Sequence, residues 1–401
     1  MFYNPRQITI LNEDQARTEL EKIGCDPAGV RIMAPKSTFR VIKLERLPAK
    51  AANLLKQTFL AKGGEVAVAR GTADLSIEAT DVLICATLKQ YRLALGQLRQ
   101  QPWGLPKVAA AVEATLAATA GFPERLYERD DRKLAIRPGW TLVMGILNVT
   151  PDSFSDGGRY RELDRALRHA EEMAAAGADI IDIGAESTRP YAGAEKVSAA
   201  EELDRLLPVL EKLLATTALP VSVDTYKAEV AAAALRLGAH MVNDVWGLQL
   251  GPEMARVAAE YQAPVVVMHN QAGTEYGGDI MDAICAFLRE SVRIGTEAGL
   301  PDGHIIIDPG IGFGKTPAQN LTVMNRLDEL KALGCPLLLG TSRKRFIGEA
   351  LGGLPAGERL EGTAATVAFG ITKGANIVRV HDVKEMVRVA RMTDAMMRGE
   401  F

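Results

Sequence analysis

The sequence LVMGILNVTPDSFSDGGRY, residues 142–160, joins a continuous apolar run to a long polar segment. The run from Leu142 to Leu147 has turn residues on both sides, which is the pattern of a strand buried on both faces of a parallel sheet. The segment that follows is crowded with Asn, Asp, Ser, Pro and Gly, and it carries Phe154 in its middle. Long polar loops after a buried strand are more often functional than simple connections. This stretch therefore predicts an α/β fold with a functional loop at a strand end.

Predicted strands and amphipathic helices alternate from Leu142 to the C-terminus. The predicted strands are residues 142–147, 179–183, 221–224, 241–244, 264–268, 304–308, 336–340 and 376–380. Helical patterns follow them, for example at residues 164–176, 199–215, 227–237, 279–298 and 384–397. Eight such units over about 265 residues match the size of a (β/α)8 TIM barrel, and an open doubly wound sheet is the alternative. Only a closed barrel would bring all eight strand ends to one mouth.

The N-terminal part of the chain predicts a separate, small α/β domain over residues 1–134, before a barrel domain over residues 135–401. Strands are expected at residues 39–44, 65–69 and 81–86, and helices at 48–62, 88–101 and 107–120. A charged linker is expected from about residue 121 to 132. Residues 134–137 and 141–146 flank Pro138-Gly139 and predict a hairpin that plugs the base of the barrel. Nothing in the sequence assigns a role to the first domain.

Composition excludes several classes of function. The formal net charge of −3 comes without a basic stripe, so extended binding to nucleic acid or anionic membranes has little support. No run of about 20 apolar residues appears, and the first residues lack a secretion-signal pattern, so we expect a cytoplasmic protein. The four cysteines are isolated from one another and from metal-ligand histidine spacing, and buried thiols are expected: Cys25, Cys85, Cys285 and Cys335.

Two glycine-rich segments resemble nucleotide or nucleophile motifs only superficially. The segment GIGFGKT, residues 310–316, would need glycine at position 309 to be a P-loop, but that residue is proline. The segment from Gly340 to Lys344 lacks the spacing of a nucleophile elbow. Nucleotide binding and acyl transfer are therefore not predicted.

Two aspartates, Asp224 and Asp308, close the third and sixth predicted barrel strands. Asp224 alone could be a helix N-cap, but an uncompensated buried carboxylate costs several kcal/mol, so a pair at one mouth implies a partner. Asn243 and Lys344 also lie at strand ends and add an amide and a cation. Together these groups suit a flat ligand with a guanidine-like donor edge and a carbonyl oxygen.

The eighth predicted strand ends in Arg379-Val-His381, which places Arg379 and His381 on the same side. A salt-bridged arginine beside a structural histidine is the alternative, but barrels often bind phosphate after strands 7 and 8, and arginine suits that anion. Asn148, at the tip of the first strand, offers an amide oxygen to Mg²⁺. Magnesium commonly keeps its waters and binds through substrate phosphates, so no all-protein cage is required.

Eight motifs resemble, in order, those of the dihydropteroate synthases. They are NVTPDSFSDGG from Asn148, DIGAESTRP from Asp182, SVDTYK from Ser222, NDVWG from Asn243, MHNQ from Met268, DPGIGFGKT from Asp308, GTSRKRFIG from Gly340 and RVHDV from Arg379. The resemblance covers about residues 135–401 and leaves out residues 1–134. It implies a transferase of folate biosynthesis that condenses 6-hydroxymethyl-7,8-dihydropterin diphosphate with p-aminobenzoate, releasing diphosphate and forming 7,8-dihydropteroate.

The resemblance also implies a role for individual residues. It assigns pterin binding to Asp224, Asn243, Met268, Asp308 and Lys344; diphosphate binding to Asn148, Arg379 and His381; Mg²⁺ to Asn148; and p-aminobenzoate binding to Phe154, Thr188, Arg189, Pro190 and Ser342. Asp152, Lys344, Arg379 and His381 are the expected catalytic residues. Ala185 and Tyr191 depart from the expected pattern of the second loop. A homodimer and inhibition by sulfonamides are expected as well.

Two other classes of function stay open at the level of sequence. A corrinoid-linked pteridine methyltransferase shares the barrel and much of the pterin site, but has no need for the diphosphate residues or the DSFSDGG loop. A non-catalytic pterin-binding scaffold protein should have lost its active-site loops. Met268 is equally well explained as a core residue.

Overall fold

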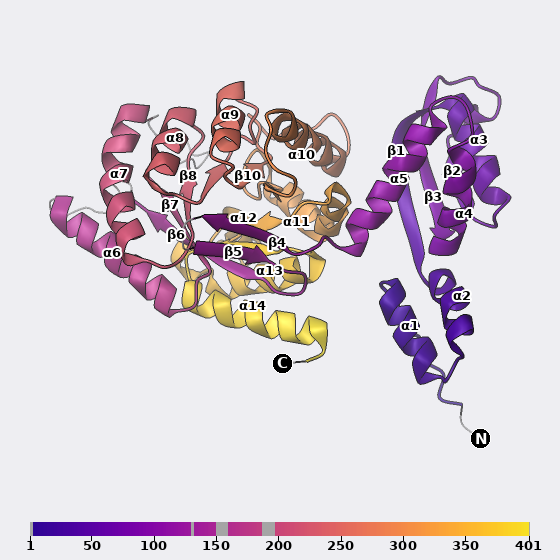
Figure 1. Ribbon diagram of the computed structural model, residues 1–401, viewed down its shortest axis with the longest axis horizontal. Helices are drawn as coiled ribbons and strands as arrows, with labels where there is room; N and C mark the ends of the chain where they lie inside the picture. The colour runs from indigo at the N-terminus through magenta and orange to yellow at the C-terminus, as the bar shows by residue number, and fades with distance from the viewer. Residues whose placement is uncertain (1–2, 130–131, 150–158, 187–196, 401) are drawn as a thin grey trace. The chain divides into compact units, whose positions relative to one another are not determined.

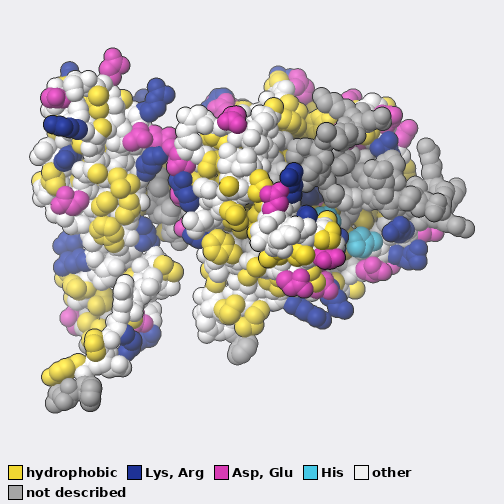
Figure 2. Space-filling model, turned by 180° about the vertical axis from the view of Figure 1, so that it is seen from behind, with side chains coloured by type: hydrophobic (Ala, Val, Ile, Leu, Met, Phe, Trp, Pro, Cys, Tyr) yellow, Lys and Arg dark blue, Asp and Glu magenta, His cyan; other side chains and the backbone are white. Residues whose placement is uncertain are grey.

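The computed structural model describes residues 3–129, 132–149, 159–186 and 197–400, and the chain divides into two units, Met1–Ala120 and Gly121–Phe401 (Figure 1). Each unit has its own hydrophobic core. Acidic and basic side chains are interspersed over the described part of the surface that Figure 2 shows, in keeping with the small net charge of −3. Within the described residues, no helix is both long and apolar enough to span a bilayer.

The first unit is built on a three-stranded antiparallel sheet in the order β1-β3-β2. Its strands alternate buried and exposed residues, so one face packs against helices in a core that includes Phe59, Ile84 and Tyr91. The elements are α1 (Glu13–Lys22), α2 (Pro27–Ser37), β1 (Phe39–Pro48), α3 (Ala49–Leu60), β2 (Glu65–Val68), β3 (Ala79–Thr87), α4 (Leu88–Leu98) and α5 (Leu105–Ala120). The sequence did not predict α1 and α2, because α1 buries only Ala16 and α2 contains Pro35.

The second unit is an eight-stranded parallel sheet in the order β11-β10-β9-β8-β7-β6-β13-β12. Its strands are β6 (Leu142–Asn148), β7 (Ile180–Gly184), β8 (Val221–Asp224), β9 (Met241–Asp244), β10 (Val265–Met268), β11 (Ile305–Asp308), β12 (Leu338–Leu339) and β13 (Ile377–Val380). Its helices are α6 (Arg159–Ala175), α7 (Ala199–Thr216), α8 (Ala228–Leu237), α9 (Pro252–Glu260), α10 (Ile280–Glu297), α11 (Pro317–Asn325), α12 (Arg345–Ala350), α13 (Leu360–Lys373) and α14 (Val383–Arg398), with a 3₁₀ segment at Leu327–Leu333.

The two ends of this sheet meet. A parallel bridge joins Ile307 of β11 to Leu337, next to β12, and the Ile307 N–H donates to the Pro336 carbonyl at 2.9 Å. The helices lie around the outside of the strands (Figure 1). The predicted TIM barrel is confirmed, and the open doubly wound alternative is wrong, because closure leaves no edge in the sheet.

The boundary between the units lies earlier than the sequence predicted. Residues 121–134 belong to the barrel unit, where β4 (Arg125–Arg129) pairs with β5 (Arg132–Ile136). The predicted hairpin between residues 134–137 and 141–146 is wrong, since β6 enters the barrel and only Arg137 and Trp140 form a bridge.

The misread linker is charged for a structural reason. Arg129 Nη1 donates to the Ala239 carbonyl at 2.7 Å, just after α8, and Arg132 Nη2 donates to the Leu214 carbonyl at 2.5 Å, in the last turn of α7. Carbonyls at helix C-termini lack partners within the helix, and arginine satisfies them well. The arginines that suggested a solvated linker therefore attach the hairpin to the barrel.

The β4–β5 hairpin closes the base of the barrel, as expected for a plug. Tyr127, Leu134 and Ile136 are buried against the inward-facing residues of the strands, which are Leu142, Met144, Ile180, Met241, Val266, Ile306, Leu338 and Ile377. The Tyr127 hydroxyl also donates to the Gly303 carbonyl at 2.6 Å. The hairpin therefore extends the barrel core instead of connecting two domains.

This packing predicts a specific loss of stability. Ile136→Ala should lower the free energy of unfolding of the barrel by about 2–5 kcal/mol, because a fully buried side chain leaves a cavity. Urea unfolding followed by tryptophan fluorescence in a Trp103→Phe background measures it, since Trp140 and Trp246 then both report on the barrel unit. Val41→Ala, at a side chain that is 54% exposed in the first unit, is the control and should change stability by less than about 0.5 kcal/mol. Equal effects of the two substitutions would contradict the plug.

Candidate active site

Strand periodicity generates the site. Side chains alternate along a strand, so the residue two positions after an inward-facing core residue also faces inward, one layer nearer the mouth. This second layer is mostly polar, whereas the first is mostly apolar. It contains Asp182 after Ile180, Asp224 after Ser222, Asn243 after Met241, Met268 after Val266, Asp308 after Ile306 and Arg379 after Ile377. Closure of the barrel therefore gathers these side chains at one end.

Arg379 lies at the centre of this layer. Its Nε donates to Asp182 Oδ2 at 2.6 Å, and its Nη2 donates to Asp224 Oδ2 at 2.7 Å. Asn243 Nδ2 also donates to Asp182 Oδ2, at 3.1 Å. The structure thus joins two predicted site residues, Asp224 and Arg379, directly to each other. It also adds Asp182, which sequence reasoning missed.

The charges of this cluster do not balance. Two carboxylates share one guanidinium, and Oδ1 of Asp182 and Oδ1 of Asp224 are both buried without a hydrogen-bond partner among the described residues. Burial raises the pKa of Asp224 to about 7; the Arg379 guanidinium opposes this shift, and the Asp182 carboxylate adds to it. An unsatisfied buried acceptor costs roughly 1–3 kcal/mol. A ligand that offers N–H donors to these oxygens would therefore bind favourably.

Asp308 lies on the neighbouring strand and is satisfied differently. Its Oδ1 accepts the Gly310 N–H at 2.7 Å. Burial raises the pKa of Asp308 to about 6, and the Gly310 hydrogen bond and the charge of Lys344 oppose the shift. Lys344 Nζ lies 4.2 Å from the centroid of the Phe313 ring, a cation–π distance. Asp308 and Lys344, both predicted from the sequence, therefore lie near each other at the mouth and interact through their charges.

Apolar side chains form one wall of the site. Met268 and Phe313 are buried together with Val245, and Tyr226 and Trp246 pack against them. Met268 is adjacent to Asp308 in the parallel register of β10 and β11. Met268 therefore belongs to a small cluster near the mouth, separate from the main core, which suits contact with a flat ligand.

Two residues predicted for different substrates contact each other. Ser342 Oγ lies 3.0 Å from His381 Nδ1 and accepts the His381 backbone N–H at 3.2 Å. Ser342 is buried and His381 is half-buried. Asn148 is half-buried at the end of β6, level with Gly184 of β7. The structure therefore places the predicted anion-binding residues at strand ends of the same mouth.

The remaining predicted residues lie outside the described part of the chain. They are Asp152, Phe154, Thr188, Arg189 and Pro190, together with Tyr191. Ala185 is described and buried. The roles predicted for the two loops therefore stay predictions.

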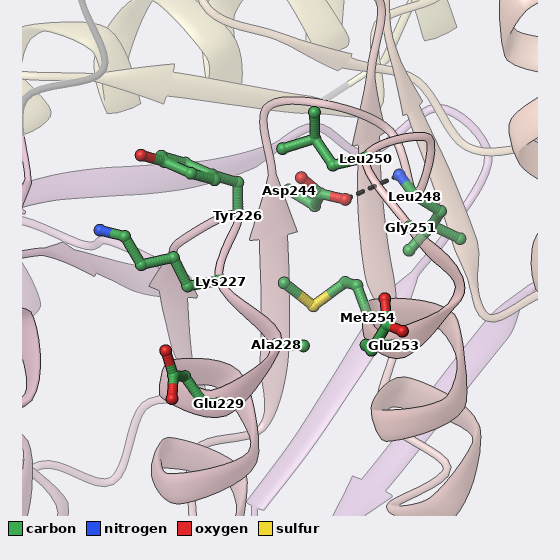
Figure 3. Close-up of a pocket in the computed structure, with 10 residues that line it drawn as sticks. All are labelled: Tyr226, Lys227, Ala228, Glu229, Asp244, Leu248, Leu250, Gly251, Glu253 and Met254. Atoms are coloured by element: carbon green, nitrogen blue, oxygen red, sulfur yellow. Dashed lines mark hydrogen bonds between the residues drawn. The ribbon is translucent and has the colours of Figure 1, made fainter. Parts of the chain in front are cut away.

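A hollow of about 410 Å³ adjoins the strand ends (Figure 3). It lies at the N-terminal ends of α8 and α9, and Tyr226, Asp244 and Met254 are among the residues that line it. Asp244 Oδ2 accepts the Leu248 N–H at 2.7 Å, the bond drawn in Figure 3. None of its lining residues binds Arg379, so this hollow is not the polar layer described above.

A family model matches most of the barrel unit, and not only its single motifs. Residues 144–381 match the family described as pterin binding enzyme. The chain is 57% identical over 257 residues to the dihydropteroate synthase of Bacillus subtilis, covering 64% of this chain and 89% of that protein. It is also 44% identical over 392 residues to a probable bifunctional folylpolyglutamate synthase/dihydropteroate synthase of Halobacterium salinarum, covering 96% of this chain and 46% of that protein. The second match includes the N-terminal unit.

Solved structures agree with the sequence relatives. A crystal structure of dihydropteroate synthase from Clostridium difficile in the presence of pteroic acid matches with a TM-score of 0.63 and 54% identity, covering 65% of this chain and 97% of that one. The enzyme from Xanthomonas albilineans in complex with 7,8-dihydropteroate matches with a TM-score of 0.62 and 39% identity, covering 68% of this chain and 99% of that one. The barrel, the polar mouth and these similarities together show that the chain belongs to the dihydropteroate synthases, a family of pterin-binding transferases in folate biosynthesis.

Proposed function

We propose that the polar layer at the barrel mouth binds the pterin ring of the diphosphate substrate through Asp224, Asn243, Asp308 and Lys344. The observation that carries this proposal is the pair of buried carboxylate oxygens, on Asp182 and Asp224, that have no hydrogen-bond partner within the described part of the chain. The amino and ring N–H groups of a pterin are the donors that such oxygens need, and a charge-assisted hydrogen bond contributes roughly 1.5–3 kcal/mol. The apolar wall formed by Met268 and Phe313 would pack on the ring face.

The diphosphate would lie at the rim, toward His381 and Asn148. Arg379 lies two residues before His381 and on the same side of the chain, so it would lie next to this rim. Arg379 is held by Asp182 and Asp224, so its charge is fixed in position before substrate binds. A preorganised cation stabilises a departing anion more effectively than a mobile one.

The reaction needs no protein nucleophile. The bond between the pterin methylene carbon and the diphosphate oxygen breaks, a bond from that carbon to the p-aminobenzoate nitrogen forms, and the nitrogen loses one proton. Positive charge develops on the pterin as diphosphate departs. The carboxylates of Asp182, Asp224 and Asp308 would favour this charge, while Arg379 and His381 would favour the leaving group. Ser342, which contacts His381, is the described residue expected at the p-aminobenzoate position.

Magnesium belongs to this proposal through Asn148. Asn148 offers a hard amide oxygen at the mouth, which suits Mg²⁺. Among the described residues, no group of three or more His, Cys, Asp or Glu could hold a metal, so substrate oxygens and water would supply the other ligands. When bound, Mg²⁺ would neutralise charge on the diphosphate.

The comparisons favour a synthase over the other two classes considered from sequence, because the relatives named above are dihydropteroate synthases. The homodimer, the sulfonamide sensitivity and the cytoplasmic location expected from sequence stay predictions. The N-terminal unit has no assigned role.

Replacing Asp308 tests the pterin assignment. Asp308→Asn should weaken binding of the pterin diphosphate by about 10- to 150-fold, the equivalent of one charge-assisted hydrogen bond. Calorimetric titration in the presence of Mg²⁺ measures the affinity. Asp244→Asn is the matched control, because Asp244 is also a buried strand-end aspartate but bonds backbone N–H groups instead of facing the polar layer. Unchanged pterin affinity in Asp308→Asn would refute the assignment.

Activity and stability should respond to pH in opposite directions. Recognition needs the ionised forms of Asp224 and Asp308, whose pKa values burial raises to about 7 and about 6, so kcat/KM for the pterin diphosphate should rise between about pH 5 and 7.

A raised folded-state pKa contributes stability that is present near pH 4 and is lost as pH rises through 6–7. The unliganded protein should therefore melt at a higher temperature at pH 5 than at pH 8, and Asp308→Asn should reduce that difference. A pH-independent kcat/KM over this range would argue against the carboxylates.

Removing the metal tests the role of Asn148. Excess EDTA should abolish diphosphate release, and added Mg²⁺ should restore it, because the leaving group needs charge neutralisation. Asn148→Ala should raise the Mg²⁺ concentration for half-maximal activity by about tenfold, while Asn148→Asp should retain metal binding. An unchanged Mg²⁺ requirement in Asn148→Ala would remove this residue from the metal site.

A further inference from the structure

The turn from Gly310 to Lys315, in the segment DPGIGFGKT, fails the P-loop pattern and still ends in a buried lysine. Lys315 is 8% exposed and has no part in the function proposed above. Lysine is seldom this buried without a specific set of partners. We therefore expect specific hydrogen-bond partners around its ammonium group.

All three hydrogen-bond donors of the Lys315 ammonium are used. Nζ lies 2.9 Å from His269 Nδ1, 3.0 Å from the Gly310 carbonyl oxygen and 3.1 Å from the Phe313 carbonyl oxygen. An ammonium group has three donors and no acceptor, so this set is complete. Lys315 thus ties two points of the turn to His269, the residue that follows β10.

The turn is pressed closely against the same residue. Gly310 has a φ of 68°, and a Cβ built on it would lie 1.9 Å from the His269 carbonyl oxygen. No side chain fits at this position, so only glycine allows the backbone to lie this close to the residue that follows β10. Lys315 and Gly310 together fix the position of the turn against the strand.

The turn carries two features of the pterin layer. The Gly310 N–H donates to Asp308 Oδ1 at 2.7 Å, and the Phe313 ring lies 4.2 Å from Lys344 Nζ. The carbonyls that Lys315 holds belong to these same two residues, Gly310 and Phe313. Displacement of the turn would therefore disturb Asp308 and Lys344 together.

We propose that Lys315 is a positioning residue that sets the geometry of Asp308 and Lys344 for pterin binding by holding the 310–313 turn. This inference rests on the proposed role of Asp308 and Lys344. Lys315 acts through the turn and does not touch the substrate in this assignment.

The charges around Lys315 agree with this arrangement. Burial lowers the pKa of His269 to about 3, and the Lys315 charge adds to the shift, so His269 is neutral and its Nδ1 accepts from Lys315 when Lys315 is an ammonium group. Burial also lowers the pKa of Lys315 to about 7; the Asp308 charge opposes this shift and the Lys344 charge adds to it. Tyr276 stacks on His269 from the following loop and donates to the Gly314 carbonyl at 2.9 Å. The charged groups that act on Lys315 are Asp308 and Lys344.

Lys315→Met tests the proposal, because it keeps the apolar stem and removes the ammonium. In the presence of Mg²⁺, calorimetry should show that the variant binds the pterin diphosphate with a dissociation constant at least tenfold higher than the parent protein does. The KM for p-aminobenzoate at saturating pterin diphosphate should stay within twofold of the parent value. The acid limb of kcat/KM should also move to higher pH, since Lys315 lowers the pKa of Asp308. Lys331→Met, at another partly buried lysine of the barrel unit, is the control for general destabilisation and should change neither quantity.

A pair of His269 variants covers the case in which Lys315→Met does not fold. His269→Asn keeps an acceptor near the Nδ1 position and should bind pterin within about threefold of the parent, whereas His269→Phe should lose at least tenfold. Unchanged pterin affinity in folded Lys315→Met, or in His269→Phe, would overturn the proposal, as would equal losses for pterin and p-aminobenzoate. If Asp308→Asn weakens pterin binding and Lys315→Met does not, only this inference fails; if Asp308→Asn has no effect, the proposed function fails first.

Discussion

The ion-pair cluster of Arg379 with Asp182 and Asp224 is the constraint on which the rest of the site depends. Two buried carboxyl groups share one partly buried guanidinium, so the cation cannot neutralise both acids when both are ionised. Removing the cation would leave both acids without compensation. The cluster joins β7 and β8 to β13, which lies on the far side of β6 and late in the sequence, so it forms only where the sheet curves enough to bring these strand ends together.

Closure in turn depends on how the barrel interior is filled. The inward-facing layer below the cluster is apolar except for Ser222, and the β4–β5 hairpin seals it from the base. Water is thereby excluded from beneath the charged groups, which strengthens their mutual interaction and raises the cost of any unpaired oxygen. A polar layer of this kind at the open end of the barrel completes its hydrogen bonds with donors that enter from the mouth, and a ligand with N–H groups supplies such donors.

The sequence predicted those parts of the structure that follow from local patterns. The eight apolar runs are short and bounded by turn residues, so the strands and the barrel could be deduced from them. Asp224 and Asp308 end their strands, which marks them as site residues. Asp182 lies inside β7 with apolar neighbours on both sides, and only the alternation of the closed barrel shows that it faces Arg379. A signal was present, because a lone acid within an otherwise apolar strand needs a buried cation. Arg129 and Arg132 were misread for the opposite reason: their partners are carbonyls in or just after the last turns of helices that are distant in sequence.

The two halves of the proposed pterin layer are satisfied by different means, and this asymmetry bears on how a ligand is oriented. On the β11 side, the Gly310 N–H and the nearby charge of Lys344 already stabilise Asp308 as an anion. On the β7 and β8 side, Arg379 binds one oxygen of each acid, and the other oxygen has no partner among the residues that the structure describes. A ring with donors along one edge and a carbonyl along another gains most when its donors face the unsatisfied oxygens and its carbonyl faces the cation. Rotating the ring would place its carbonyl against carboxylates, so the charge pattern of the polar layer selects one orientation of the substrate.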